Sequence, residues 1–170
     1  MKKFTSLLAI VTMLLFVGCT DNSSPTPKSS KALFQTVPAG KATLTQKGEG
    51  RESCVICGMN LPKYYKTSHA ADTKSGEKRQ YCSIHCVVED NEVNKTDLEN
   101  LKVVDTNSLK LISVYKAFYV VGSSKSATMS RTSKYAFATK SQADTFAKKF
   151  GGKVMNFNDT YTVAMKDFRR

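Results

Sequence analysis

The sequence predicts an α+β fold made of two small units, each with the order strand, strand, helix, strand. Short apolar runs bounded by turn residues predict the strands, and apolar residues spaced three and four apart predict the helices. The same order of elements occurs twice, although no long-period sequence repeat accompanies it. We therefore expect two ββαβ-like units, at residues 51–106 and 107–170.

The first unit is predicted to contain two strands, a capped helix and a closing strand. Turn residues at 72–76 separate the first two strands. Ser83 has the side chain of an N-cap and precedes a helix that is expected to run to about Asn91. The expected strands cover residues 63–71, 77–82 and 101–105.

The second unit contains the best-defined helix of the sequence. Thr139 and Gln142 form a capping box at its start, and the pair Gly151-Gly152 ends it. Asp159 is expected to cap a terminal helix that runs to residue 168. The expected strands cover residues 116–122, 134–138 and 153–157. The apolar residues of the capped helix share one face: Ala143, Phe146, Ala147 and Phe150.

Two short sulfur-rich stretches form the strongest candidate site. Cys54 and Cys57 are followed by Gly58, which tolerates positive φ and lets the pair fold as a knuckle with N–H groups turned towards the sulfurs. Cys82 and Cys86 are four residues apart, so a helix places them on one face. Paired spacings of this kind predict that the four thiols converge on one metal ion.

Disulfides, a redox-active site and a haem-attachment site are the alternatives to a metal site at these cysteines. Disulfides, from Cys54 to Cys57 or from Cys82 to Cys86, are alternatives in an oxidising compartment. A thioredoxin-like active site is not expected, because no βαβ pattern surrounds the first pair. Covalent haem in its usual form is excluded, because Gly58 stands where that motif needs His.

The ligand types distinguish between two metals. Four thiolates suit zinc, and a knuckle, a hairpin and a helix-start pair in this order are typical of a treble-clef zinc site, which is structural and closed. Cu(I) is softer and also accepts thioether ligands at low coordination number. Met59, close to Cys57, and Met129, in a polar stretch, are useful only to such a soft ion. The sequence therefore favours Cu(I), with zinc as the alternative.

The N-terminus is typical of a bacterial lipoprotein precursor. Two lysines precede an apolar run at residues 7–17 that is too short for a comfortable membrane span and fits a signal peptide of residues 1–18. The end of this run, Gly18-Cys19, resembles a lipobox. That resemblance implies cleavage before Cys19 and lipid attachment to its sulfur. An ordinary secretory signal with a free Cys19 is the alternative.

The segment that follows is expected to connect the lipid to the folded part. Residues 20–30 are rich in Ser, Thr and Pro, so we expect residues 19–50 to form a flexible tether. Thr20, rather than Asp, follows Cys19. By the lipobox resemblance, this residue implies that the lipoprotein is sorted to the outer membrane. We expect the protein in the cell envelope, anchored to a membrane by lipid and facing the periplasm.

The basic charge of the chain does not indicate a nucleic-acid partner. There are 26 Lys and Arg against 14 Asp and Glu, which gives a net charge of +12. The basic residues are scattered, and no nucleic-acid-binding motif accompanies them. Attraction to an anionic lipid surface fits this charge better.

Several motifs together resemble the NosL family, whose members are lipid-anchored copper chaperones for nitrous-oxide reductase. The resemblance covers roughly residues 52–157 and the lipoprotein leader. The motifs that carry it are Cys54-x-x-Cys57-Gly58-Met59-Asn60-Leu61, Val103-Val104-Asp105, Ala117-Phe118-Tyr119-Val120, Met129, Ala136-Phe137, Ala143-x-x-Phe146-Ala147 and Gly151-Gly152-x-Val154.

The resemblance implies a fold and a function. NosL proteins have paired ββαβ units, as organomercurial lyase does, which agrees with the order of elements above. The family's Cys-x-Met falls on Cys57 and Met59, and its later Met falls on Met129. The implied role is a Cu(I) chaperone without catalysis, whose partner is a copper-accepting reductase or its assembly machinery. A monomer is favoured.

This chain departs from the family pattern in two places. Thr128 stands where the family commonly has Pro before the later Met. Cys82 and Cys86 are thiols that many members lack, so the chain could bind a second ion or use a four-cysteine site that is not the delivery site.

Two function classes follow from these patterns. One is a Cu(I) carrier, and the other is a lipoprotein whose structural four-cysteine zinc site serves as an interaction module. An enzyme of the organomercurial-lyase type is third, because it needs a carboxylic acid beside two thiols. The sequence does not place Asp72 or Asp105 there.

Overall fold

The structure is a computed structural model that describes residues 33–168 of the chain. These residues belong to one compact unit, Lys31–Arg170. The expected signal peptide, the lipid attachment at Cys19 and the first part of the expected tether lie outside the described residues. Among the described helices, none has the length and apolar character needed to cross a membrane.

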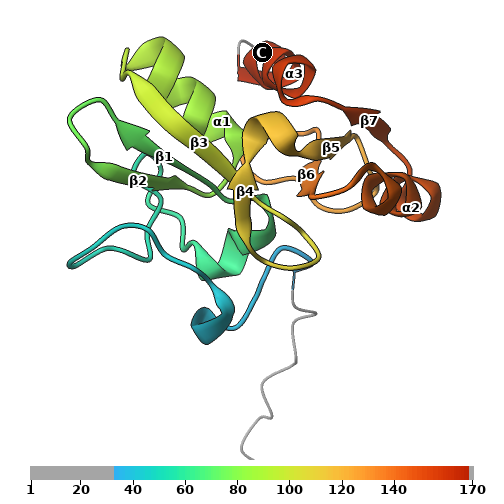
Figure 1. The fold of residues 1–170 in the computed structure, drawn as a ribbon, viewed down its shortest axis with the longest axis horizontal. Helices are drawn as coiled ribbons and strands as arrows, with labels where there is room; N and C mark the ends of the chain where they lie inside the picture. The colour runs from blue at the N-terminus through green and yellow to red at the C-terminus, as the bar shows by residue number, and fades with distance from the viewer. Residues whose placement is uncertain (1–32, 169–170) are drawn as a thin grey trace, which may run out of the picture. The chain divides into compact units, whose positions relative to one another are not determined.

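The first sheet has four antiparallel strands in the order β2-β1-β3-β4 (Figure 1). Between β2 and β3 the chain forms the short helix α1 (Ile84–Val88), which continues into a π-helical turn, η3 (Glu89–Val93). This part of the chain therefore has the ββαβ order that the sequence predicts. The strands are β1 (His69–Thr73), β2 (Lys78–Tyr81), β3 (Leu98–Val104) and β4 (Leu111–Ser113).

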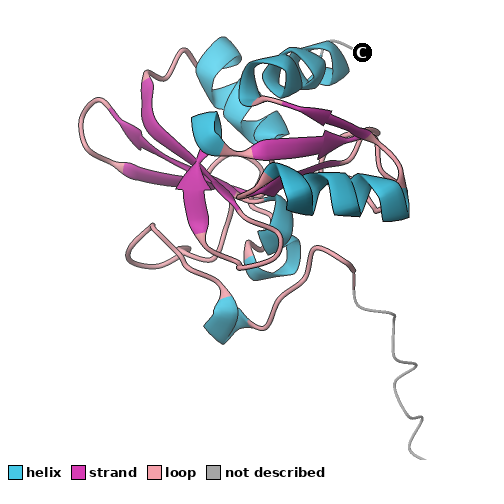
Figure 2. Ribbon diagram, turned by 45° about the vertical axis from the view of Figure 1, so that its right-hand side comes forward, coloured by secondary structure: helices cyan, strands magenta, loops and turns pink. Residues whose placement is uncertain are grey.

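The second sheet has three antiparallel strands with β5 (Phe118–Val121) in the centre, between β6 (Lys134–Phe137) and β7 (Lys153–Met155). Helix α2 (Lys140–Phe150) connects β6 to β7 and packs against this sheet (Figure 2). The Thr139 side chain caps the α2 N-terminus by accepting a hydrogen bond from the backbone N–H of Gln142 at 3.3 Å. The reciprocal half of the predicted capping box is not formed, because the Gln142 side-chain oxygen has no hydrogen-bond partner among the described residues.

Alternating residues of β5 face two different cores. Val120 packs with Phe146 of α2, while Tyr119 and Val121 belong to a core shared with the first sheet. Helix α3 (Phe157–Phe168) covers this side and packs against α1, as Figure 1 shows. The shared core contains Ile84, Val88, Val103, Val114, Ala117, Tyr119, Val121, Ala136, Phe157 and Ala164.

The predicted boundary at residue 106 is therefore not a boundary between independent units. Strand β4 follows that boundary but pairs with β3, and the turn η4 (Val114–Lys116) connects it to β5. Asp105 forms a bridge with Ala136 of β6, and its carboxylate accepts a hydrogen bond from the N–H of Ala138 at 3.1 Å. The two ββαβ units are recognisable as topology, but they fold around one common core.

Four local expectations are corrected by the structure. Residues 62–67 form the 3₁₀ helix η2 (Pro62–Thr67) rather than a strand, because Pro62 pre-sets helical φ at its start. Strand β4 was not predicted, since only three residues form it. Asn156, not Asp159, caps α3, with its side-chain oxygen accepting the Asp159 N–H at 2.9 Å. Ser83 occupies the N-cap of α1 without making a side-chain capping bond.

Residues 33–50 are part of the folded unit. Gln35 and Val37 are buried, and the Phe34 ring lies 5.3 Å from that of Tyr135 in an edge-to-face arrangement. A short turn, η1 (Ala39–Lys41), follows. The prediction of a flexible tether is therefore wrong for these residues, because Gln35 and Val37 are buried and Phe34 packs against Tyr135.

Candidate metal centre

The first cysteine pair lies in a small hairpin at residues 52–61. Ser53 and Asn60 form an antiparallel bridge, and inside it the N–H of Cys54 donates to the carbonyl of Met59 at 2.9 Å. The N–H of Gly58 donates back to the Cys54 carbonyl at 2.9 Å, with Gly58 at φ +71°. Only a residue that tolerates positive φ closes this turn without strain, so the knuckle expected from the sequence is confirmed.

The second pair lies at the junction of β2 and α1. Cys82 directly follows β2, and Cys86 lies one helical turn later in α1. The N–H of Val55 donates to the carbonyl of Gln80 at 3.2 Å, which fastens the first hairpin to β2. This contact brings the two pairs together.

All four thiol groups converge, as the sequence predicts. The sulfurs of Cys57, Cys82 and Cys86 form a triangle, with separations of 3.5 Å (Cys57–Cys82), 3.6 Å (Cys57–Cys86) and 3.7 Å (Cys82–Cys86). Cys54 completes the group, and the four sulfurs lie within 4.8 Å of one another. All four are free thiols. We call these four residues the thiol group.

The sulfur spacing fits one ion held by several thiolates. A tetrahedral ion with metal–sulfur bonds of about 2.3 Å separates its sulfurs by about 3.8 Å, and a planar three-coordinate ion with the same bonds separates them by about 4.0 Å. The observed triangle is close to both values and slightly nearer the first. Small side-chain movements would therefore suffice for either geometry.

The thiol group is closed on one side and open on the other. Cys54, Cys82 and Cys86 are buried among Leu61, Tyr81 and Val87, whereas Cys57 and Met59 are only half-buried. The thioether sulfur of Met59 lies 3.9 Å from the sulfur of Cys82. A neutral thioether and the most exposed thiol therefore lie together on the open side of the thiol group.

Protons are distributed unevenly over the buried thiols. Hydrogen bonds from Cys82 and Cys86 hold the pKa of Cys54 well below its usual range. Its thiolate in turn raises the pKa values of Cys82 and Cys86, because they act as hydrogen-bond donors to it and burial disfavours further charge. Deprotonation is therefore favoured at Cys54 over Cys82 and Cys86, and an ion must displace protons from these two to bind their sulfurs as thiolates.

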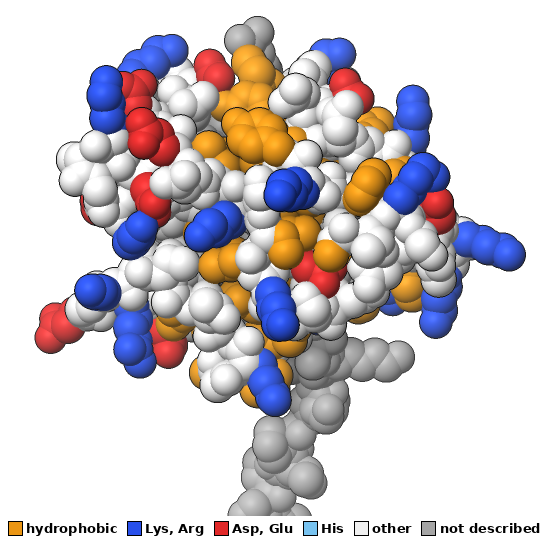
Figure 3. Space-filling view, in the orientation of Figure 1, with side chains coloured by type: hydrophobic (Ala, Val, Ile, Leu, Met, Phe, Trp, Pro, Cys, Tyr) orange, Lys and Arg blue, Asp and Glu red, His pale blue; other side chains and the backbone are white. Residues whose placement is uncertain are grey.

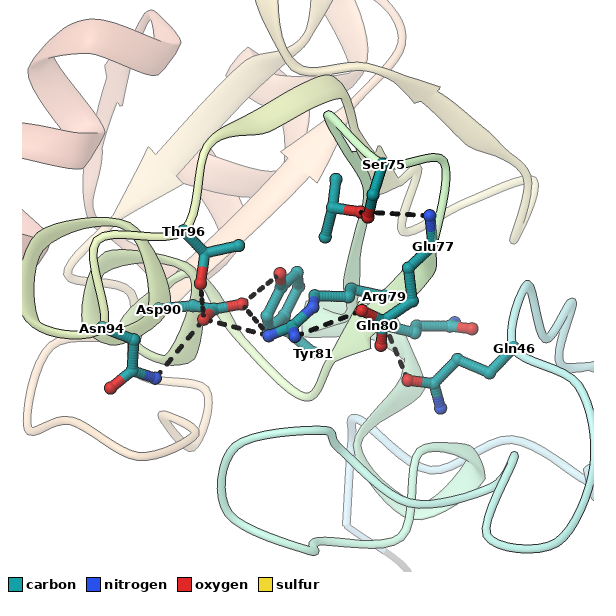
Figure 4. Close-up of polar contacts among 10 residues, drawn as sticks. Gln46, Ser75, Glu77, Arg79, Gln80, Tyr81, Asp90, Asn94 and Thr96 are labelled. Carbon is teal, nitrogen blue, oxygen red and sulfur yellow. Dashed lines mark hydrogen bonds and ion pairs between the residues drawn. The ribbon is translucent and has the colours of Figure 1, made fainter.

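Asp90 fixes the segment that carries Cys82 and Cys86 (Figure 4). This carboxylate is fully buried in the π-helical turn η3. It accepts hydrogen bonds from Tyr81 at 2.8 Å, from Thr96 at 2.7 Å and from the guanidinium of Arg79 at 2.8 Å. Burial raises the pKa of Asp90, but the hydrogen bonds outweigh burial and hold that pKa below its ordinary value. The network ties β2 to the helix, so Cys82 and Cys86 are held in place without a metal.

The structure places the two methionines differently. Met59 packs against the thiol group, whereas Met129 is 39% exposed and lies in a cleft of about 410 Å³ with Arg131 and Asp167. The residue before it, Thr128, connects to the thiol group indirectly. The side-chain oxygens of Thr128 and Thr67 are 2.9 Å apart, and that of Thr67 donates to the Cys82 carbonyl at 2.8 Å.

Neither candidate carboxylate belongs to the thiol group. Asp105 is buried, and its oxygens accept hydrogen bonds from the backbone N–H groups of Ser108 and Ala138. Asp72 on β1 pairs with Lys78 at 2.7 Å. The group of metal-binding side chains found among residues 33–168 contains four cysteines and no acid.

Sequence reasoning missed the supporting residues Asp90 and Thr67. Asp90 lies four residues after Cys86, and an acidic residue one turn along an apolar helix face was the available signal. For Thr67, which is buried at the end of η2, the sequence offers no comparable signal.

The comparisons with known proteins agree with this architecture. The NosL family model matches residues 45–164, which include the four cysteines of the thiol group and the two candidate methionine ligands, Met59 and Met129. The fold is similar to that in the crystal structure of the copper chaperone NosL from Shewanella denitrificans, with a TM-score of 0.54 and 21% sequence identity. That match covers 67% of this chain and 92% of the other. No curated protein sequence matches the chain. Because the family model spans well over half of the sequence, the chain belongs to the NosL family.

Proposed function

We propose that this protein is a lipid-anchored Cu(I) chaperone that delivers copper for the maturation of nitrous-oxide reductase. The observation that carries the proposal is the Met59 thioether sulfur, 3.9 Å from Cys82 on the open side of the thiol group. Family membership and the likeness to a copper chaperone point in the same direction and away from an enzyme.

The ligand set is selective for a soft ion. Cu(I) accepts thiolates and thioethers at low coordination number, whereas zinc gains little from a thioether. In the proposed site Cys57, Met59 and the buried thiols of Cys82 and Cys86 surround the ion, with Cys54 as the thiolate already present. We propose Met129, in the loop before β6, as a second thioether ligand; in this structure it lines the cleft with Arg131 and Asp167 and would turn towards the ion.

Transfer would begin at the exposed edge of the site. An acceptor ligand adds to the copper beside Cys57 and Met59, where the ion is accessible, and the chaperone ligands then leave one at a time. Met59 leaves without a proton, Cys54 remains a thiolate, and the thiolates of Cys82 and Cys86 each take up a proton from solvent, so no electron moves. The copper remains Cu(I) throughout.

A carrier must keep its fold after its ion has left. The largest core, around Tyr119, and the core around Phe146 contain no member of the thiol group, whereas the core around Leu61 and Tyr81 includes it. The Asp90 network also holds the helix of Cys86 without a metal. Both features support a metal-free state that is folded and ready to bind copper again.

The thiol spacing favours a second candidate, a structural zinc site in a lipoprotein that acts as an interaction module. Sulfur separations of 3.5 to 3.7 Å are close to the roughly 3.8 Å of a tetrahedral four-thiolate site. Such a site would be closed, and its metal would contribute to folding free energy.

The place of action follows from the expected leader. With lipid on Cys19, the folded unit would lie at a membrane surface in the periplasm. Thr20 after the lipidated cysteine favours sorting to the outer membrane. Figure 3 shows lysine and arginine side chains spread over the face in view, not gathered into one patch. This distribution supports a partner other than nucleic acid, and we propose a copper-accepting reductase or its assembly machinery, met by a monomer.

Metal-specific effects of Met59 separate the two candidates. In competition titrations, Met59→Leu should weaken Cu(I) binding and leave Zn(II) binding almost unchanged, because only copper uses the thioether. Met155→Leu is the matched control, since Met155 packs against the shared core away from the thiol group, and it should change neither affinity. Equal losses of both metals in Met59→Leu would assign this residue a packing role and contradict the copper site.

A further inference from the structure

One buried hydroxyl connects the two segments that carry sulfur ligands. The Thr67 side chain is 2% exposed, and its oxygen lies 2.8 Å from the Cys82 carbonyl and 2.9 Å from the Thr128 hydroxyl. Cys82 belongs to the thiol group, and Thr128 directly precedes Met129. Thr67, at the end of η2, therefore links the backbone of Cys82 to the β5–β6 loop one residue before Met129.

Hydrogen bonds also fix the part of the β5–β6 loop that is N-terminal to Met129. The Gln35 side-chain amide donates to the Ser126 carbonyl at 2.8 Å, and the Tyr135 hydroxyl donates to the same carbonyl at 2.7 Å. Gln35 and Tyr135 are both buried. The backbone leading to Thr128 is thus held by two buried side chains from other parts of the chain.

A second anchor follows Met129. The ammonium of Lys134, which is buried, donates to the Thr132 carbonyl at 2.9 Å and to the Ser130 hydroxyl at 3.2 Å. It also pairs with Asp167 of α3 at 2.8 Å. The loop is therefore fixed on both sides of a single residue.

Met129 itself adopts an unfavourable conformation. Its φ of +57° lies in the left-handed region, which residues with a side chain rarely adopt. Its side chain is 39% exposed, so burial does little to offset this strain. Residues with strained backbone conformations cluster at functional sites. Here the surrounding contacts maintain such a conformation at a residue whose thioether is exposed to solvent.

We propose that Thr67 and Thr128 are positioning residues that hold Met129 in register with the thiol group, so that its thioether completes the Cu(I) site. The inference rests on the proposed function, since it takes Met129 as a copper ligand. Threonine at position 128 supplies a hydroxyl to this link, which the proline expected from the family pattern would lack.

Thr128→Val tests the link, because valine keeps the shape of threonine and removes the hydroxyl. One hydrogen bond is typically worth about 1 kcal/mol, so Cu(I) binding should weaken about three- to tenfold. Affinity for Zn(II), which the thiols alone bind, should not change. In a Met129→Leu background, Thr128→Val should cause no further loss of Cu(I) affinity, because the thioether that it positions is gone.

The control is Thr145→Val on the exposed face of α2, whose hydroxyl bonds only within its helix, to the Ser141 carbonyl. It should leave Cu(I) affinity unchanged, and thermal melts should show each variant folded. Equal weakening by Thr128→Val in both backgrounds, or equal weakening of zinc, would overturn the positioning role. If Met129→Leu alone binds Cu(I) normally, Met129 is no ligand, and that part of the proposed function fails first.

Discussion

The Tyr81 hydroxyl donates a 2.8 Å hydrogen bond to the buried carboxylate of Asp90, nine residues further along the chain. Between these two residues lie Cys82 and Cys86. The bond therefore connects the two ends of the strand–helix segment that carries two of the four thiols. Because Arg79 and Thr96 bind the same carboxylate, the segment is fixed by side chains that are not metal ligands (Figure 4).

Asp90→Asn should destabilise the metal-free protein. The amide keeps the shape of the carboxylate but loses the charge that Arg79 pairs with and puts a donor where an acceptor is needed. We expect the free energy of unfolding to fall by about 3 kcal/mol, measured by urea denaturation. Tyr81→Phe removes only one donor and should cost less, about 1 to 2 kcal/mol. Similar, small losses in both variants would show that Asp90 does not organise this segment.

Stability should depend on pH through His69. Burial lowers the pKa of this imidazole to about 4, and the ring hydrogen-bonds the Tyr119 hydroxyl at 3.2 Å. Unfolded chains bind the proton near pH 6.5, so the stability contributed by neutral His69 is present above that pH and is lost as pH falls towards 4. The loss amounts to about 3 kcal/mol.

The chain has two histidines, which makes this prediction simple to check by NMR. One imidazole should titrate near pH 4 in the folded protein, and urea denaturation should show stability declining between pH 6.5 and 4. His69→Gln should flatten that decline. A His69 ring that titrates near its ordinary pKa would contradict its burial against Tyr119.

The double variant Cys82→Ser and Cys86→Ser should fold and bind Cu(I) more weakly. Cys57 and Met59 remain as ligands, and the cores around Tyr119 and Phe146 do not involve the lost thiols. Circular dichroism checks the fold and competition titration gives the affinity. A variant that cannot fold, while the matched Met155→Leu protein does, would favour the structural zinc site.

Membrane attachment should depend on Cys19. Replacing Cys19 by Ser should release the protein into the soluble fraction or block its processing, because no lipid can be attached. Fractionation of cells followed by a salt wash measures this. A processed Ser variant that still sediments with membranes would mean that something other than lipid is the anchor.

The sequence predicted the convergence of the four thiols better than the contacts around them, for a local reason. A knuckle needs only Gly58 after a close cysteine pair, and the spacing of Cys82 and Cys86 needs only a helix. Position 67 was expected in a strand, and its role depends on Thr128, sixty-one residues away. The same holds for Gln35, whose burial depends on a loop that follows it by about ninety residues.

The fold class followed from periodicity, whereas the domain division did not. The apolar run of β5 predicts a strand, but only the tertiary structure shows that Tyr119 and Val120 enter different cores. The three residues of β4 are too few to form a recognisable pattern. The sequence therefore does not predict that this strand joins the two ββαβ units.

The central claim is that the folded protein carries Cu(I) and survives its departure. The most direct measurement is a thermal melt followed by circular dichroism, on soluble protein without Cys19, before and after a Cu(I) chelator withdraws the metal. The account predicts one Cu(I) transferred per chain and a cooperative melt in both states, with a lower midpoint after withdrawal. Loss of the cooperative melt when metal is removed, with copper failing to reload, would contradict the carrier and support a structural ion.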